Sequence, residues 1–94
     1  MDNFTVRIAL RNATADDYAE LDAKMKAKGF KTTITGENGK VYDLPAAEYN
    51  YSSGSDTVAG VNDKARDIAQ SVKALPAVIV SKVVARAWSG LTSD

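Results

Sequence analysis

The N-terminal segment places two arginines where they could contact an anionic partner. Residues 3 to 11 carry an apolar side chain at every second position: Phe4, Val6, Ile8 and Leu10. This period of two is typical of a strand with one buried face. The opposite face then carries Arg7 and Arg11, exposed to water or to a partner. Arginines placed in this way can contact phosphates or pair with carboxylates.

The function predicted for these arginines depends on the register of a second strand. Either Tyr49 and Tyr51 or Glu48 and Asn50 share the arginine face, and Pro45 prevents the sequence from fixing which. With the tyrosines exposed, the face would resemble the RNA-reading surface of an RRM, where aromatic rings stack on bases and cations contact phosphates. With Glu48 exposed, a carboxylate neutralises an arginine across the strands. Because Ala47, Tyr49 and Tyr51 alternate like a set of core-facing residues, the sequence favours the second, structural interpretation.

The densest basic run of the chain follows at Lys24, Lys26, Lys28 and Lys31. Such a run could extend a basic surface toward phosphates. Lysines at the end of a helix more often stabilise the helix dipole, and we favour that role for this run. The candidates for RNA contact are therefore Arg7, Arg11, Lys31, Tyr49 and Tyr51.

The remaining polar and aromatic features are interpreted as structural. Asp16 and Asp17 fall in the first turn of a predicted helix, where carboxylates favour the dipole, so they do not indicate a metal site. Gly36 and Gly39 flank a turn between strands, which is the wrong context for a phosphate-binding loop. Trp88 is expected in the core rather than at an interface. We expect no metal and no cofactor.

The amino-acid composition narrows the possible chemistry. The 94 residues include no cysteine and no histidine, which excludes disulfides, thiolate metal sites and Ser-His-Asp catalysis. Lys plus Arg and Asp plus Glu number 12 each, so the zero net charge gives no general attraction to nucleic acid or to an anionic membrane. There is no basic segment followed by a long apolar run. We expect a cytoplasmic protein with no membrane partner.

Local signals predict two helices and four strands. A helix should begin at Thr14 and end at Gly29, with acidic residues in its first turn and lysines in its last. Asn38-Gly39 predicts a type I′ hairpin turn over residues 37 to 40. The next strand should run from 40 to 51 with an interruption at Pro45. A second helix follows from about residue 58 to 72, and a final strand over 77 to 84.

This order of elements predicts a fold. Strand, helix, two strands, helix and strand give the α+β ferredoxin-like βαββαβ arrangement in a single domain spanning residues 1–94. Right-handed crossovers would place both helices on one face of a four-stranded antiparallel sheet with strand order 4-1-3-2.

The chain also resembles the GhoS-like family of small bacterial and prophage proteins. The resemblance rests on NFTVRIALRNAT, GFKTTIT, GKVYDLPAAEYNY and the Arg-x-Trp of Arg86 and Trp88, and it covers most of the sequence. It implies a ferredoxin-like fold and an antitoxin that acts as an endoribonuclease on messenger RNA. It identifies no catalytic residue, so the catalytic set is unknown.

Two functions therefore remain. The first is a GhoS-like RNA-binding protein, an endoribonuclease if it is an enzyme, that contacts single-stranded RNA through the open sheet face. The second is a non-catalytic protein interaction module of phage or mobile-element origin, which would form a homodimer or bind a host protein through the sheet face or an edge strand.

Overall fold

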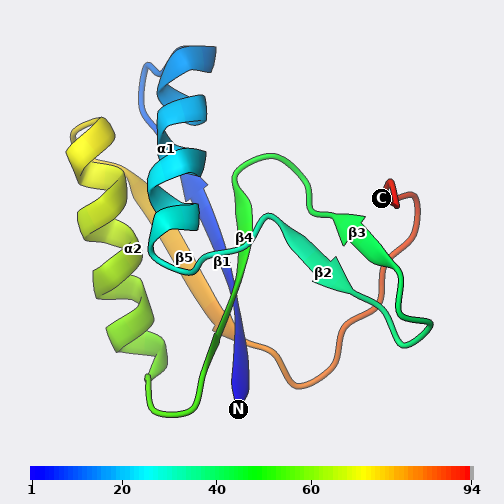
Figure 1. Ribbon diagram of the computed structural model, residues 1–94. Helices are drawn as coiled ribbons and strands as arrows, with labels where there is room; N and C mark the ends of the chain where they lie inside the picture. The colour runs from blue at the N-terminus through cyan, green and yellow to red at the C-terminus, as the bar shows by residue number, and fades with distance from the viewer. Residues whose placement is uncertain (94) are drawn as a thin grey trace.

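In the computed structural model, which describes residues 1–93, the chain forms two helices and two antiparallel sheets (Figure 1). The elements are β1 (Asp2–Ala9), α1 (Ala15–Ala27), β2 (Thr33–Thr35), β3 (Val41–Asp43), β4 (Glu48–Ser53), α2 (Val58–Val72) and β5 (Ala77–Lys82). The predicted α+β class and both predicted helices are confirmed. Neither helix in the described part of the chain has the length and apolar composition needed to cross a membrane.

Helix α1 begins and ends where its sequence signals predict. Thr14 Oγ1 accepts a hydrogen bond from Asp17 N at 3.2 Å, and Asp17 Oδ2 accepts one from Thr14 N at 2.9 Å. This reciprocal capping box satisfies two backbone donors that have no partner within the helix. At the other end Gly29 has φ 90°, a conformation that glycine adopts without the steric penalty of a side chain. Gly29 N and Phe30 N donate back to the carbonyls of Lys26 and Met25, which closes the helix.

Strand β1 is the centre of the larger sheet, whose strand order is β4-β1-β5. Its apolar side chains point to the face that both helices cover, because they form one core cluster with helix residues. The buried members of this cluster are Phe4, Val6, Ile8, Leu10, Leu21, Met25, Phe30, Tyr49, Val61, Ala65 and Ala69. The alternation in the N-terminal segment therefore identified the core face correctly, and the other face of the sheet carries no helix.

The prediction of one four-stranded sheet is wrong. Strands β2 and β3 form a separate two-stranded sheet, and the predicted strand over 40 to 51 is divided into β3 and β4. The break follows from Pro45, which has no N–H for a ladder, and from a turn in which Glu48 N donates to the Pro45 carbonyl at 3.2 Å. Ala47 within this turn has φ 60°. Two 2.8 Å bonds between the backbones of Lys31 and Asn50 form an isolated bridge where the fourth strand was expected.

The β2–β3 hairpin is present, but its turn is not type I′. That turn needs positive φ at both central residues, whereas the described non-glycine residues with positive φ are Asn12, Ala47 and Leu75. Gly36 N donates to the Lys40 carbonyl at 2.8 Å, Gly39 N donates to the Gly36 carbonyl at 3.0 Å, and Gly39 has φ 80°. The loop is thus three residues long, with glycine at its single left-handed position.

The segment after β5 connects the two sheets. Residues 83 to 93 leave the end of β5 and run to the β2–β3 sheet, the orange-to-red path in Figure 1. Val83 N donates to the Asn3 carbonyl at 2.8 Å at one end, and Asp43 N donates to the Thr92 carbonyl at 2.9 Å at the other. We call residues 83 to 93 the C-terminal segment.

Candidate anion and nucleic-acid interface

A polar ladder lines the sheet face that the helices leave open. Three residues of β1 lie opposite three of β4 in the pairs Asn3–Ser52, Thr5–Asn50 and Arg7–Glu48. The register with Glu48 and Asn50 on the arginine face is therefore confirmed. Arg7 Nε lies 3.6 Å from Glu48 Oε1, and the Arg7 side chain is 71% exposed. Water screens such a pair strongly, so it contributes little to stability while it offsets the charge of Arg7.

The two tyrosines point to the other side of β4. Tyr49 is fully buried in the core, where its hydroxyl donates to Asp22 of α1. Burial, with this hydrogen bond to a carboxylate, raises the pKa of Tyr49 far above its usual value. Tyr51 stacks on Phe30 with ring centroids 4.4 Å apart. Neither ring is on the open face, so the RRM-like arrangement of arginines beside Tyr49 and Tyr51 does not form.

Arg11 does not share the face of Arg7. Strand β1 ends at Ala9, and Asn12 has φ 51°, so the chain turns before the alternation can continue. Arg11 Nε donates to the Leu75 carbonyl at 2.6 Å, which places this arginine beside the loop before β5. The expectation of a strand through residue 11 with two arginines on its open face is therefore wrong.

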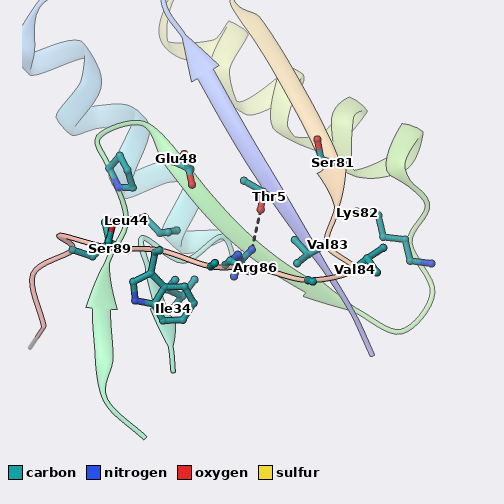
Figure 2. Close-up of a pocket in the computed structure, with 15 residues that line it drawn as sticks. Thr5, Ile34, Leu44, Glu48, Ser81, Lys82, Val83, Val84, Arg86 and Ser89 are labelled. Atoms are coloured by element: carbon teal, nitrogen blue, oxygen red, sulfur yellow. Dashed lines mark hydrogen bonds between the residues drawn. The ribbon is translucent and has the colours of Figure 1, made fainter. Parts of the chain in front are cut away.

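The arginine that does contact the centre of the open face comes from the C-terminal segment. Figure 2 shows this segment crossing β1 and β4, with Arg86 directed at Thr5. Arg86 Nη2 donates to Thr5 Oγ1 at 2.8 Å and to Asn50 Oδ1 at 3.0 Å. Both acceptors are uncharged, so these bonds orient the half-buried guanidinium without neutralising it.

Arg86 and Lys31 line a polar hollow between the two sheets. The hollow has a volume of about 460 Å³ and is lined by Asn3, Lys31, Thr33, Ile34, Thr35, Val41, Asn50, Ser52 and Arg86. These lining residues include two cations, three hydroxyls and two amides, and none of them is acidic. We call this site the Arg86 hollow. The backbone bridge from Lys31 to Asn50 holds Lys31 at its rim.

Trp88 lies on the surface next to this hollow and is not a core residue. It is 38% exposed and contacts Tyr42 of β3, with ring centroids 5.5 Å apart and an interplanar angle of 60°. The prediction of core burial is wrong because the C-terminal segment crosses the open face, away from both helices. Trp88 and Arg86 also line a groove of about 620 Å³ that reaches Glu48 and Pro45 (Figure 2).

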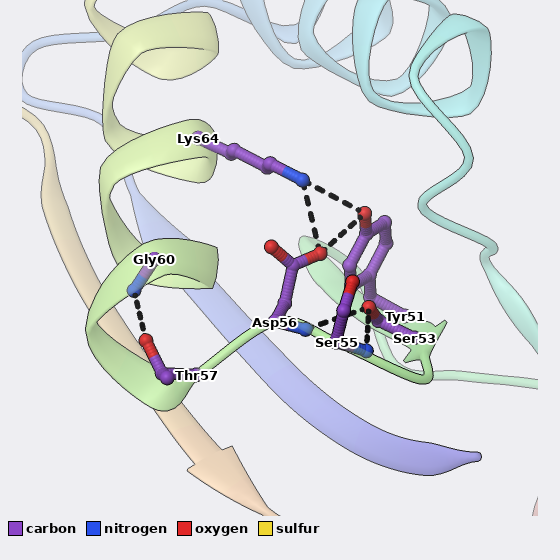
Figure 3. A network of polar contacts seen from close by, with 7 residues as sticks. All are labelled: Tyr51, Ser53, Ser55, Asp56, Thr57, Gly60 and Lys64. Carbon is purple, nitrogen blue, oxygen red and sulfur yellow. Dashed lines mark hydrogen bonds and ion pairs between the residues drawn. The ribbon is translucent and has the colours of Figure 1, made fainter.

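A second polar cluster, on the helix side, has a structural role (Figure 3). Lys64 Nζ donates to Asp56 Oδ2 at 2.9 Å and to the Tyr51 hydroxyl at 3.2 Å, and that hydroxyl donates to Asp56 at 3.0 Å. The hydrogen bond from Lys64 lowers the pKa of Asp56, and the bond to Asp56 raises the pKa of Lys64. The pair is thus held ionised. It ties the end of β4 to helix α2. In the same loop, Ser53 Oγ accepts hydrogen bonds from the backbone N–H groups of Ser55 and Asp56.

Sequence reasoning kept Lys31 as a candidate but did not propose Arg86 as a site residue. The C-terminal segment has no hydrophobic period that could predict its path, and its contacts are with residues 36 and 81 positions earlier in the chain. The only available signal was an arginine two residues from the single tryptophan. Within residues 1–93, no three acidic side chains lie close enough together to hold a metal ion.

Comparison of the chain with protein-family models, with curated proteins and with solved structures gives no match.

Proposed function

We propose that this protein binds single-stranded RNA at the Arg86 hollow. The observation that carries the proposal is a guanidinium held by two neutral side chains, in a hollow that also contains Lys31 and has no acidic residue in its lining. A phosphate group is the complementary ligand, because it can accept hydrogen bonds from both cations and from the surrounding hydroxyls and amides.

The geometry of Arg86 suits phosphate binding. Its Nη2 is used in the bonds to Thr5 and Asn50, which fix the plane of the group. A guanidinium has five N–H donors, so Nε and Nη1 retain donors for a phosphate oxygen. Because the group is oriented before the ligand arrives, little side-chain entropy is lost on binding.

A local site fits the overall charge of the protein. With zero net charge there is no long-range attraction to a polyanion, so binding must come from a few well-placed contacts. The hydroxyls and amides of the hollow could also bond to the 2′-hydroxyl, which distinguishes RNA from DNA. The resemblance to the GhoS-like family agrees with RNA as the ligand. The proposal is one of binding, because it rests on the contacts of the Arg86 hollow with phosphate and assigns no general base to the 2′-hydroxyl.

The test compares two double variants against a labelled RNA octamer at several salt concentrations. Arg86→Gln with Lys31→Gln removes both cations of the hollow and keeps polar side chains there. Each phosphate contact on a single strand contributes about 0.7 to the slope of log K against log salt, so the slope should become shallower by about 1.4. Fluorescence anisotropy measures the affinity.

The matched control is Lys26→Gln with Lys28→Gln, which makes the same charge change at exposed positions of the α1 end. Its salt slope should stay close to that of the wild type. Equal salt slopes for the two double variants would contradict the proposal, since they would show that RNA affinity depends on the total charge of the protein and not on the cations of the hollow.

The alternative function, a protein interaction module, has one observation in its favour. Strand β5 forms an edge of the main sheet, and Ile79 on it is 63% exposed. An exposed edge with an apolar side chain can pair with a second copy of the chain. Absence of RNA binding by the wild type, together with a dimer in sedimentation velocity that Ile79→Lys converts to a monomer, would favour this alternative.

A further inference from the structure

We propose that the aromatic hollow beside Arg86 binds one unpaired nucleobase of the RNA by stacking it on Trp88. This inference rests on the proposed RNA binding and extends it by assigning a site to a base. The hollow has a volume of about 670 Å³ and is lined by Thr35, Gly36, Glu37, Asn38, Tyr42, Arg86, Ala87 and Trp88. We call it the Trp88 hollow.

Trp88 has the exposure that a stacking platform needs. Its contact with Tyr42 is tilted by 60°, so the two rings do not cover each other, and 38% of the residue remains exposed. A base can stack on an indole whatever its sequence identity, because every base has a π face. Trp88 is the single tryptophan of the chain, so its environment can be followed without interference from a second indole.

The turn of the hairpin holds the aromatic pair in place. Asn38 Nδ2 donates to the Tyr42 hydroxyl at 3.2 Å, which fixes the Tyr42 ring, and Tyr42 supports Trp88. A Cβ atom on Gly36 would lie 3.2 Å from the Tyr42 ring and 3.4 Å from Trp88. The absence of a side chain at Gly36 therefore lets both rings approach the turn closely.

Arg86 connects the base site to the phosphate site. It lines both the Arg86 hollow and the Trp88 hollow, and it lies two residues before Trp88 in an extended segment. A nucleotide whose phosphate contacts Arg86 can therefore place its base toward Trp88. The two hollows together provide what a single-stranded binding site requires, a cationic contact for the backbone and an aromatic face for a base.

Glu37 gives this site a chemical preference among bases. Its exposed carboxylate lines the Trp88 hollow and can accept a hydrogen bond from an exocyclic amino group. Adenine, cytosine and guanine each carry such a group on the Watson–Crick edge, whereas uracil has two carbonyls and no exocyclic amino group. Octamers of adenosine or cytidine should therefore bind more tightly than octamers of uridine.

The experiment uses the fluorescence of Trp88, which is the only tryptophan in the chain. Oligoadenylate octamers are titrated into the 94-residue wild type, and indole emission is recorded together with the anisotropy of the labelled RNA. Stacking should quench the emission with the same midpoint as the anisotropy change. Trp88→Ala should weaken binding by roughly tenfold, within the range found for loss of one base stack.

Trp88→Phe is the control for folding, since it keeps an aromatic ring and should retain most of the affinity. Ribose 5-phosphate, which has no base, is the control ligand and should give no quenching at concentrations where adenosine 5′-phosphate does. RNA binding without quenching, and with equal affinity for the wild type and Trp88→Ala, would overturn the base site and leave the phosphate site standing. No RNA binding by the wild type would overturn both.

Discussion

Arginine has three different roles at the residue scale in this protein. Arg7 faces a carboxylate, Glu48, across the strands, and Arg11 donates to the carbonyl of Leu75. Arg86 donates to an uncharged hydroxyl and an uncharged amide on neighbouring strands. The side chain is the same in each case, but Arg86 alone of these three is both held in a fixed orientation and placed in a polar hollow without acidic lining. Whether an arginine is free to bind an anion therefore depends on the groups that accept its hydrogen bonds in the fold, and the alternation of the sequence does not show which groups these are.

Tyr49 provides a prediction about alkaline pH. Burial and the hydrogen bond to Asp22 raise the pKa of Tyr49 in the folded state, whereas an unfolded chain has a phenol pKa of about 10. The folded state thus holds this proton more tightly. Its contribution to stability is fully present below pH of about 10 and is lost as the pH rises above that value.

We expect Tyr49→Phe to remove this part of the pH dependence. The variant should also be less stable at neutral pH by about 1 to 3 kcal/mol, because it leaves the Asp22 carboxylate without its donor. Urea unfolding at a series of pH values from 8 to 11 measures both effects. If the free energy of unfolding of the wild type and of the variant falls in parallel above pH 10, the proton on Tyr49 does not contribute to the pH dependence of stability.

At the element scale, the helices could be predicted in detail and the sheets only in part. Thr14 and Gly29 act through neighbours within a few residues, so the sequence contains all the information that places the ends of α1. Pro45 indicated an interruption, but whether β3 and β4 stay in one sheet depends on contacts with distant strands. The pairing of Lys31 also depends on a distant strand: it forms a single bridge to Asn50 where a full strand pairing was expected.

The cap of α1 allows an element-scale prediction. Thr14→Ala removes the hydroxyl that accepts the Asp17 backbone bond, and loss of such a cap costs about 1 kcal/mol. Thr14→Ser keeps the oxygen and should stay close to the wild type. Thermal unfolding followed by circular dichroism measures the difference. RNA affinity should be unchanged in both variants, since α1 lies on the opposite face of the sheet from the Arg86 hollow.

On the scale of the whole molecule, the C-terminal segment contacts both sheets, which are also linked by the backbone bridge between Asn50 of β4 and Lys31, just before β2. A hairpin of two short strands is only marginally stable alone, so β2 and β3 need outside contacts. The C-terminal segment supplies them through the Asp43 N to Thr92 O bond and the contact between Trp88 and Tyr42. Trp88 and Tyr42, which make one of these contacts, also line the Trp88 hollow of the proposed RNA site. The proposed RNA binding would therefore be coupled to the position of the hairpin.

This coupling predicts the result of shortening the chain after Val83. The buried core cluster extends from Phe4 to Ala69, and the partly buried side chains against it reach only to Val80, so the truncated chain keeps all of them. We expect it to unfold cooperatively with helical circular dichroism like that of the full chain, at a lower midpoint. Amide exchange should become faster in residues 33 to 43, because the hairpin loses its contacts with the C-terminal segment.

RNA binding should fall below detection in the same truncated protein. Removal of Arg86 and Trp88 eliminates the phosphate contact and the stacking platform together, so the loss should exceed that of Arg86→Gln with Lys31→Gln. The comparison is made by anisotropy at low salt, where weak electrostatic binding is easiest to detect. A truncated chain that still bound the octamer with the salt slope of the wild type would place the site on the remaining sheet face. In that case Arg7 and Lys31, which the truncation leaves in place, would be the cations to test next.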